Sequence, residues 1–198
     1  MKLYLLRHGE TELNVKKVYY GSTDCALTAK GREQAQSLRS VFESLPLDVV
    51  LESPLRRAGD TASLLLGDHP APRIVDDRLK ELDFGAWEGR SWQELQGDEV
   101  FELWCREWQS TRPPGGESFL DLAARVRSFY EELMQRKEEA VLIVAHHAVL
   151  QQLMTCLLNS EPAHCWHYAF SQGAFTLFEV NEAFGVLKGH NLTALDKI

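Results

Sequence analysis

The amino-acid sequence predicts an α/β protein, a three-layer α/β/α sandwich with a mostly parallel central sheet. Three short apolar runs, at residues 2–7, 47–51 and 140–144, have the length and composition of buried strands. Segments with the periodicity of amphipathic helices separate these runs along the chain. Strands that alternate with helices pair in parallel through right-handed crossovers, so this order indicates a layered α/β fold.

The remaining elements follow from periodicity and from residues that typically begin a helix. Ser53 followed by Pro54 is typical of a helix start, because serine caps the first turn and proline fits its first position. Ser91 and Glu94 have the spacing of a capping box. Helices are predicted at residues 28–45, 53–66, 98–109, 118–137 and 148–158, with late strands at 175–180 and 185–187.

Length and charge restrict the partners of the protein. The chain has 198 residues, 44% of them hydrophobic, which suits one compact domain over residues 1–198. Its formal net charge of −8 argues against nucleic acid or a membrane as a partner, because both attract basic surfaces. A small phosphorylated metabolite is still compatible with this net charge, since a local basic pocket can form on an acidic protein. The four cysteines lack disulfide or zinc spacing, which favours reduced thiols and a cytoplasmic location.

Cationic and imidazole side chains follow each of the three predicted central strands. Arg7-His8 ends the first strand, the pair Arg56-Arg57 comes soon after the second, and His146 follows the third. Ligands of open α/β sheets bind beyond the carboxyl ends of the strands, so these side chains should meet at one edge. With the carboxylate of Glu81, they make a suitable site for a phosphate with a proton donor beside it.

The order and spacing of these residues resemble a known family. The chain is similar to the histidine phosphatase superfamily, which also contains the cofactor-dependent phosphoglycerate mutases. The motifs that carry the resemblance are Leu6-Arg7-His8-Gly9-Glu10-Thr11 with Asn14, Leu27-Thr28-x-x-Gly31, Ser53-x-Leu55-x-Arg57-Ala58-x-x-Thr61-Ala62, Glu81-x-x-x-Gly85-x-Trp87-Glu88-Gly89 and Val144-Ala145-His146. They keep their order and span nearly the whole chain.

The resemblance implies a role for each matched residue. His8 would attack phosphorus and form a phosphohistidine, and Glu81 would protonate the leaving alcohol and then accept a proton from water. The motif spacing selects Arg57 over Arg56. The phosphoryl oxygens would be bound by Arg7, Asn14, Arg57 and His146. The resemblance also implies activity without a metal or organic cofactor, and a helical lid excursion over about residues 84–118.

One departure from the family pattern and a narrower likeness concern the substrate. His147 stands where the family usually has glycine, so its side chain would crowd the phosphate or contact the leaving group. Residues 104–119 and 161–173 resemble the α-ribazole phosphatases of cobalamin biosynthesis, which act on α-ribazole 5′-phosphate or its cobamide form. Trp104 and Trp108 lie four residues apart, so both can share one helix face. They would either pack the excursion onto the sheet or form an aromatic wall for a base.

Several rival functions share these residues. A phosphoglycerate mutase would use the same site, and so would a broad-specificity small-molecule phosphatase. A non-catalytic phospho-ligand binding module needs neither a nucleophile nor an acid, so the set of His8, Glu81 and His146 weighs against it. His164 and His167 have helical spacing, but no third ligand matches them, so no metal site is predicted. Nothing in the sequence predicts an oligomeric state.

Overall fold

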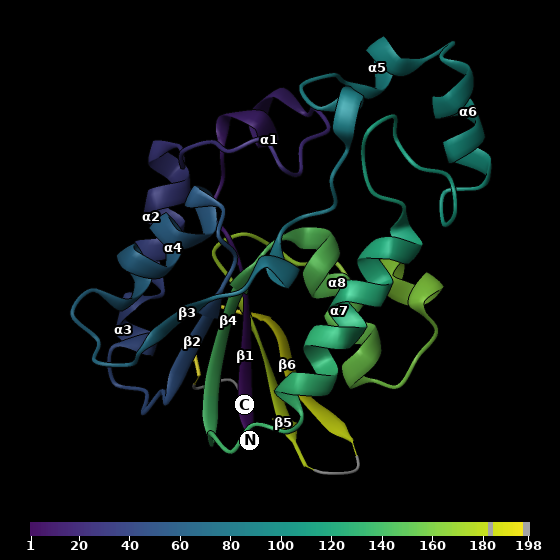
Figure 1. Cartoon of the computed structure of the whole chain (residues 1–198). Coiled ribbons are helices and arrows are strands. Elements are labelled where there is room, and N and C mark those ends of the chain that lie inside the picture. Colours follow the sequence, from purple (N-terminus) through teal and green to yellow (C-terminus); the bar gives the residue numbers. More distant parts are fainter. Residues whose placement is uncertain (182–183, 196–198) are drawn as a thin grey trace.

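The computed structural model describes residues 1–181 and 184–195. Its centre is a six-stranded sheet in the order β3-β2-β4-β1-β5-β6 (Figure 1). The strands are β1 (Lys2–Arg7), β2 (Val49–Glu52), β3 (Arg73–Val75), β4 (Ala140–Ala145), β5 (Phe175–Val180) and β6 (Gly185–Leu192). The first four in the order pair in parallel, whereas β5 and β6 are antiparallel to their neighbours. The prediction of a mostly parallel sheet is confirmed.

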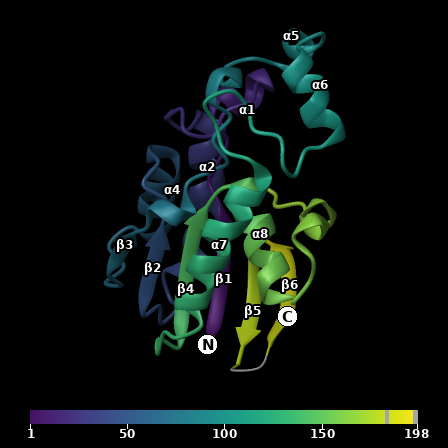
Figure 2. The ribbon, with the colours of Figure 1, turned by 45° about the vertical axis from the view of Figure 1, so that its right-hand side comes forward.

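Helices cover both faces of the sheet. On one face Tyr4 and Leu6 of β1 pack among side chains of α3 and α4, and on the other Leu3 and Leu5 pack among side chains of α7 and α8. This alternation along β1 is the period-two pattern of a strand buried on both faces. Figures 1 and 2 show the resulting three layers, as predicted. The helices are α2 (Ala29–Ser37), α3 (Arg39–Phe42), α4 (Arg56–Leu66), α7 (Phe119–Leu133) and α8 (His147–Leu157), with the 3₁₀ helices η1 (Asp77–Leu79) and η3 (Pro162–His167).

An excursion of the chain stands beyond the carboxyl ends of the strands. It contains η2 (Gly85–Trp87), α5 (Trp92–Leu95) and α6 (Glu99–Arg106), and lies at the top of Figure 1 near α1 (Glu12–Lys16). Trp87, Leu95 and Phe101 form a small core of its own. Among the helices that the structure describes, none is both long and apolar enough to cross a lipid bilayer.

The register of the parallel strands aligns the residues at their ends. Arg7 of β1 pairs with Ala145 of β4, so His8 and His146 leave the sheet side by side. The backbone N–H of His8 extends the ladder by donating to the Ala145 carbonyl oxygen over 3.0 Å. The sheet therefore brings two residues separated by more than half of the chain to one position.

Three predicted elements differ from the structure. The helix expected at residues 28–45 is divided at Leu38, where the backbone N–H turns to the Ala35 carbonyl, an i−3 bond that tightens the turn. Strand β3 was not predicted, because its three residues are all exposed and carry no alternation. Ser53 does not cap α4: the cap residue is Leu55, and the Ser53 hydroxyl binds a histidine instead.

Candidate active site

His8 follows β1 and is almost fully buried, with 3% of its surface exposed. Its Nδ1 lies 2.7 Å from the Gly9 carbonyl oxygen, and because a carbonyl only accepts, Nδ1 carries the proton. Burial, together with the charges of Arg57 and Arg7, holds the pKa of His8 well below its usual range. The ring is therefore neutral at physiological pH, with a lone pair on Nε2 that suits a nucleophile.

The loop that carries His8 is held by close backbone packing. The Gly9 N–H donates to the Thr61 hydroxyl oxygen over 3.0 Å. A Cβ added at Gly9 would overlap the carbonyl oxygen of Gly31, and one added at Gly31 would overlap the backbone of Glu10. Glycine at both positions lets the loop after β1 lie directly against the first turn of α2.

Arg57 is completely buried and is held by neutral acceptors. Its Nη1 and Nη2 donate to the Thr23 and Gly21 carbonyl oxygens over 2.8 and 2.6 Å, and its Nε donates to Nδ1 of His146 over 3.2 Å. The guanidinium also lies 4.8 Å from the centre of the Tyr20 ring, within range of a cation–π interaction. The neighbouring Arg56, by contrast, is exposed and pairs with Asp60 over 3.3 Å.

His146 lies next to His8, with 5.1 Å between the ring centres. Because Nδ1 accepts from Arg57, the proton is on Nε2, which donates to the Ser53 hydroxyl over 2.7 Å. Burial and the neighbouring His8 and Arg57 hold the pKa of His146 well below its usual range.

Arg7 and Arg57 carry positive charges that no carboxylate neutralises. Arg7 is partly buried, and its Nη1 donates to the Phe170 carbonyl oxygen over 2.9 Å, whereas its buried Nε has no hydrogen-bond partner. In the described part of the chain, neither arginine has a carboxylate oxygen within 4.0 Å. Two fixed guanidinium groups beside two neutral imidazoles form a site for a multiply charged anion such as a phosphate.

Asn14 lies on the first turn of α1. Its Oδ1 accepts from the backbone N–H of Thr11 over 3.1 Å and from Nε2 of Gln172 over 2.8 Å. The first of these bonds belongs to the capping box that begins α1. Asn14 is therefore held both by its own helix and by the segment before β5.

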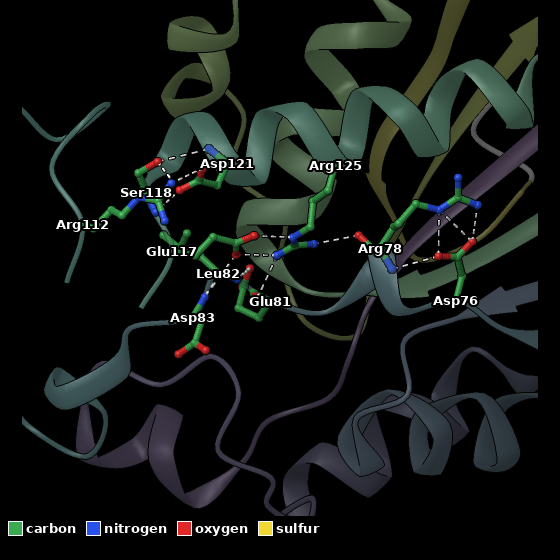
Figure 3. A network of polar contacts seen from close by, with 10 residues as sticks. All are labelled: Asp76, Arg78, Glu81, Leu82, Asp83, Arg112, Glu117, Ser118, Asp121 and Arg125. Atoms are coloured by element: carbon green, nitrogen blue, oxygen red, sulfur yellow. Dashed lines mark hydrogen bonds and ion pairs between the residues drawn. The ribbon is translucent and has the colours of Figure 1, made fainter. Parts of the chain in front are cut away.

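Glu81 lies on an irregular segment after η1, and α7 holds that segment in place (Figure 3). Its carboxylate accepts from the backbone N–H groups of Leu82 and Ala148 over 3.0 and 3.2 Å. Arg125 donates to the Glu81 carbonyl oxygen over 3.0 Å and to the Arg78 carbonyl oxygen over 2.7 Å. Arg125 itself forms an ion pair with Glu117, in which Nε of Arg125 lies 2.7 Å from Oε1 of Glu117. A residue without regular secondary structure thus has a defined position next to α8.

A mostly aromatic cavity of about 350 Å³ opens beside Glu81. Its walls come from the excursion, from α8 and from η3, and the residues that line it are Tyr19, Glu81, Leu82, Phe84, Trp92, Trp104, Trp108, Phe119, His147, Ala148, Gln151 and Trp166. None of these residues is lysine or arginine. The cavity therefore suits an uncharged, flat group attached to the anion bound next to it.

The prediction that Trp104 and Trp108 share a helix face is wrong, because α6 ends at Arg106. Trp104 stacks on Phe101 inside the excursion, with ring centres 5.9 Å apart. Trp108 lies beyond the helix and packs edge-on against Phe119, with ring centres 4.6 Å apart. Both rings nevertheless line the same cavity, so each has a packing partner on one side and a wall position on the other.

His147 begins α8 and also lines the cavity. Burial and the nearby charge of Arg7 lower its pKa to about 4. Its Nδ1 is buried without a hydrogen-bond partner.

The rings of His164 and His167 stack with centres 5.5 Å apart, but no group of three potential metal ligands occurs among the residues that the structure describes.

Three residues of the site were not predicted from the sequence. Ser53 contacts His146 and stands in the Ser53-x-Leu55-x-Arg57 motif, whereas Tyr20 contacts Arg57 and no pattern in the sequence indicates it. Glu88 accepts from the backbone N–H groups of Gly21 and Ser22 over 3.0 and 2.7 Å, and so orients the loop whose carbonyls hold Arg57. Its place in the Trp87-Glu88-Gly89 motif was the available signal.

The site and fold agree with a known class of enzyme. The sequence matches the histidine phosphatase superfamily (branch 1) over residues 3–193, and the chain belongs to this family. It is 35% identical to the adenosylcobalamin/alpha-ribazole phosphatase of Escherichia coli (strain K12) and 37% identical to that of Salmonella typhimurium (strain LT2), over 98% of each chain. The structure of the alpha-ribazole phosphatase from Shigella flexneri is similar, with a TM-score of 0.95, 36% identity and 98% coverage of both chains.

A relative that is named for another activity is more distant in sequence. Phosphoserine phosphatase 1 of Hydrogenobacter thermophilus is 31% identical, over 98% of this chain and 93% of its own. The family and these relatives identify the protein as a phosphatase, a hydrolase of phosphoric esters.

The lowered pKa of His147 predicts an acid-dependent stability. Unfolded histidine binds a proton below about pH 6.5, whereas folded His147 binds it only near pH 4, so the unfolded state holds more protons between these values. The free energy of unfolding should therefore fall as the pH drops from 6.5 to 4. His147→Asn should flatten that slope by up to about 1.4 kcal/mol per pH unit. Urea unfolding at several pH values measures the slope, and His164→Asn, on an exposed ring, serves as the control. An equal slope in wild type and His147→Asn would contradict the prediction.

Proposed function

We propose that the phosphatase removes the 5′-phosphate of α-ribazole 5′-phosphate, or of its cobamide form, in cobalamin biosynthesis, through a phosphohistidine on His8. The observation that carries the proposal is the aromatic cavity, whose lining includes Glu81 and His147, two residues whose side chains interact electrostatically with Arg7 of the anion site. Relatives that cover 98% of the chain bear the name adenosylcobalamin/alpha-ribazole phosphatase. A phosphate bound near His8 would direct its aromatic ester group into the cavity.

The reaction proceeds in two steps, formation of the phosphohistidine and its hydrolysis. Nε2 of His8 attacks phosphorus as the ester P–O bond breaks, and Glu81 gives its proton to the departing alkoxide oxygen. The carboxylate of Glu81 then takes a proton from a water molecule, whose oxygen attacks the phosphohistidine. Inorganic phosphate leaves and the lone pair returns to Nε2. Charge on the phosphoryl oxygens is stabilised in both steps by Arg7, Asn14, Arg57 and His146.

The composition of the cavity favours this substrate over carboxylate-bearing ones. Phosphoserine and phosphoglycerate each carry a carboxylate close to the phosphate, and burying that charge requires a cationic partner. No lysine or arginine is among the described residues that line the cavity. A benzimidazole ring needs only flat apolar surface, which Trp104, Trp108 and Phe119 provide. The cavity volume of about 350 Å³ suits the base, whereas the macrocycle of a cobamide would stay outside.

A covalent trap combined with a substrate panel tests the proposal. Rapid acid-free quenching with labelled α-ribazole 5′-phosphate should show acid-labile, base-stable phosphate on wild-type protein and none on His8→Ala. The value of kcat/KM should be higher for this substrate than for 3-phosphoglycerate or phosphoserine. Label that appears on a second acceptor, in place of inorganic phosphate, would indicate a mutase and would overturn the proposal. A phosphoenzyme that forms fastest with phosphoserine would overturn the substrate assignment alone.

The role of Glu81 predicts a dependence on the leaving group. Glu81→Gln should lower the rate of phosphoenzyme formation by about 10²–10⁴-fold for an alkyl phosphate, whose alcohol leaves poorly without a proton. With p-nitrophenyl phosphate the same step should lose less than tenfold, because p-nitrophenolate needs no proton to leave. Burst kinetics separates this step from hydrolysis of the phosphoenzyme. Equal losses for both substrates would mean that Glu81 is not the acid.

Arg125 should affect the same step through the position of Glu81. Arg125→Lys loses the planar fork that reaches both the Glu81 and Arg78 carbonyl oxygens, and a displacement of about 1 Å costs up to about 10²-fold in rate. The loss should be larger for an alkyl phosphate than for p-nitrophenyl phosphate. Arg78→Lys is the matched control, since Arg78 pairs with Asp76 and Glu132 at the far end of the network in Figure 3. A loss independent of the leaving group would show that Arg125 acts on stability alone.

A further inference from the structure

One wall of the aromatic cavity is polar, and α8 provides it. His147 and Gln151 lie four residues apart on α8, so their side chains share one helix face, and both line the cavity. Only 3% of Gln151 is exposed. Its Oε1 and the Nδ1 of His147 are both buried without a hydrogen-bond partner. Two polar atoms without a hydrogen-bond partner thus belong to residues that line a mostly aromatic cavity.

The orientation of the Gln151 amide is determined by its other end. Nε2 donates to the Tyr168 carbonyl oxygen over 2.7 Å. Exchanging the amide oxygen and nitrogen would place Oε1 against that carbonyl, and two acceptors repel each other. Oε1 therefore keeps this orientation, in which only an O–H or N–H group from outside the protein can satisfy it.

Buried acceptors without partners are rare in folded proteins, and a bound ligand is one explanation for them. The aromatic rings of the cavity have no donor directed at Gln151 in the structure. The donor must therefore come from the molecule that fills the cavity. Two hydroxyl groups satisfy these atoms: one donates to Oε1 of Gln151, and the other donates to Nδ1 of His147 or accepts a hydrogen bond from it.

We propose that Gln151 is a specificity-determining residue, whose Oε1 accepts a hydrogen bond from a sugar hydroxyl of the substrate while His147 contacts the neighbouring hydroxyl. The inference rests on the proposed function, since it assigns the ribose of a riboside phosphate to the α8 wall. His147 is close enough to Arg7 and His8 to affect their electrostatics, and Gln151 lies one turn further from them. The order phosphate, sugar, base then runs from the anion site along α8 to the tryptophans.

The experiment compares two adjacent glutamines on substrates with and without hydroxyl groups. Gln151→Leu should lower kcat/KM for α-ribazole 5′-phosphate by about 5- to 150-fold, the effect of a buried hydroxyl without its acceptor. It should change kcat/KM for p-nitrophenyl phosphate by less than about twofold, because that substrate has no hydroxyl group. Gln152→Leu is the matched control: Gln152 is equally buried and donates to the Pro162 carbonyl oxygen over 2.9 Å, but it does not line the cavity. Its effect should be the same on both substrates.

Deoxy substrates test the same hydrogen bond in the unchanged protein. Either the 2′-deoxy or the 3′-deoxy form of α-ribazole 5′-phosphate should be a poorer substrate of the wild type, and Gln151→Leu should not slow that form further. Full activity of the wild type on both deoxy forms would overturn the inference. So would a loss in Gln151→Leu that is equal on all substrates or equal to that of Gln152→Leu. Failure of the wild type to prefer α-ribazole 5′-phosphate would instead refute the proposed function.

Discussion

The site depends on the burial of the Arg57 guanidinium without a carboxylate beside it. Removing a cation from water is unfavourable unless polar groups replace its hydration. Here the carbonyl oxygens of Gly21 and Thr23 and the Nδ1 of His146 replace it, and all three are neutral. A carboxylate in their place would cancel the charge and compete with the phosphate. Neutral acceptors leave the positive potential available to the ligand.

The requirement for those neutral acceptors explains much of the surrounding structure. The parallel register of β1 and β4 places His8 and His146 side by side, and α4 carries Arg57 to both. The carbonyls that hold Arg57 belong to the loop at residues 21–23, and Glu88 of the excursion orders that loop through its backbone N–H groups. The excursion is therefore connected to the anion site as well as to the cavity. A change in its packing can reach Arg57 without touching the phosphate.

The parts of the site that could be predicted from the sequence are those next to buried strands. His8 and His146 each follow an apolar run directly, so the run determines where they lie, and motif spacing distinguished Arg57 from Arg56. The contacts of Ser53 and Tyr20 could not be predicted, because they depend on distant segments meeting at their side chains. Strand β3 was missed because it is a short, exposed edge strand whose residues show no alternation of polar and apolar side chains. Helix α6 ends at Arg106, before the predicted end at residue 109, so Trp108 lies outside the helix and does not share a face with Trp104.

Affinity and selectivity arise at different places in this arrangement. The anion site recognises the group that every phosphomonoester shares, so it contributes nothing to the choice among them. Aromatic walls favour flat ligands in proportion to the area buried, but one methylene more or less changes the preference only by about 10- to 200-fold. A buried hydrogen-bonding atom discriminates much more strongly, because an analogue without the matching group leaves that atom unpaired. If Oε1 of Gln151 is such an atom, the strongest discrimination among substrates would come from the residues of α8. The tryptophans of the excursion would then tolerate changes in the base.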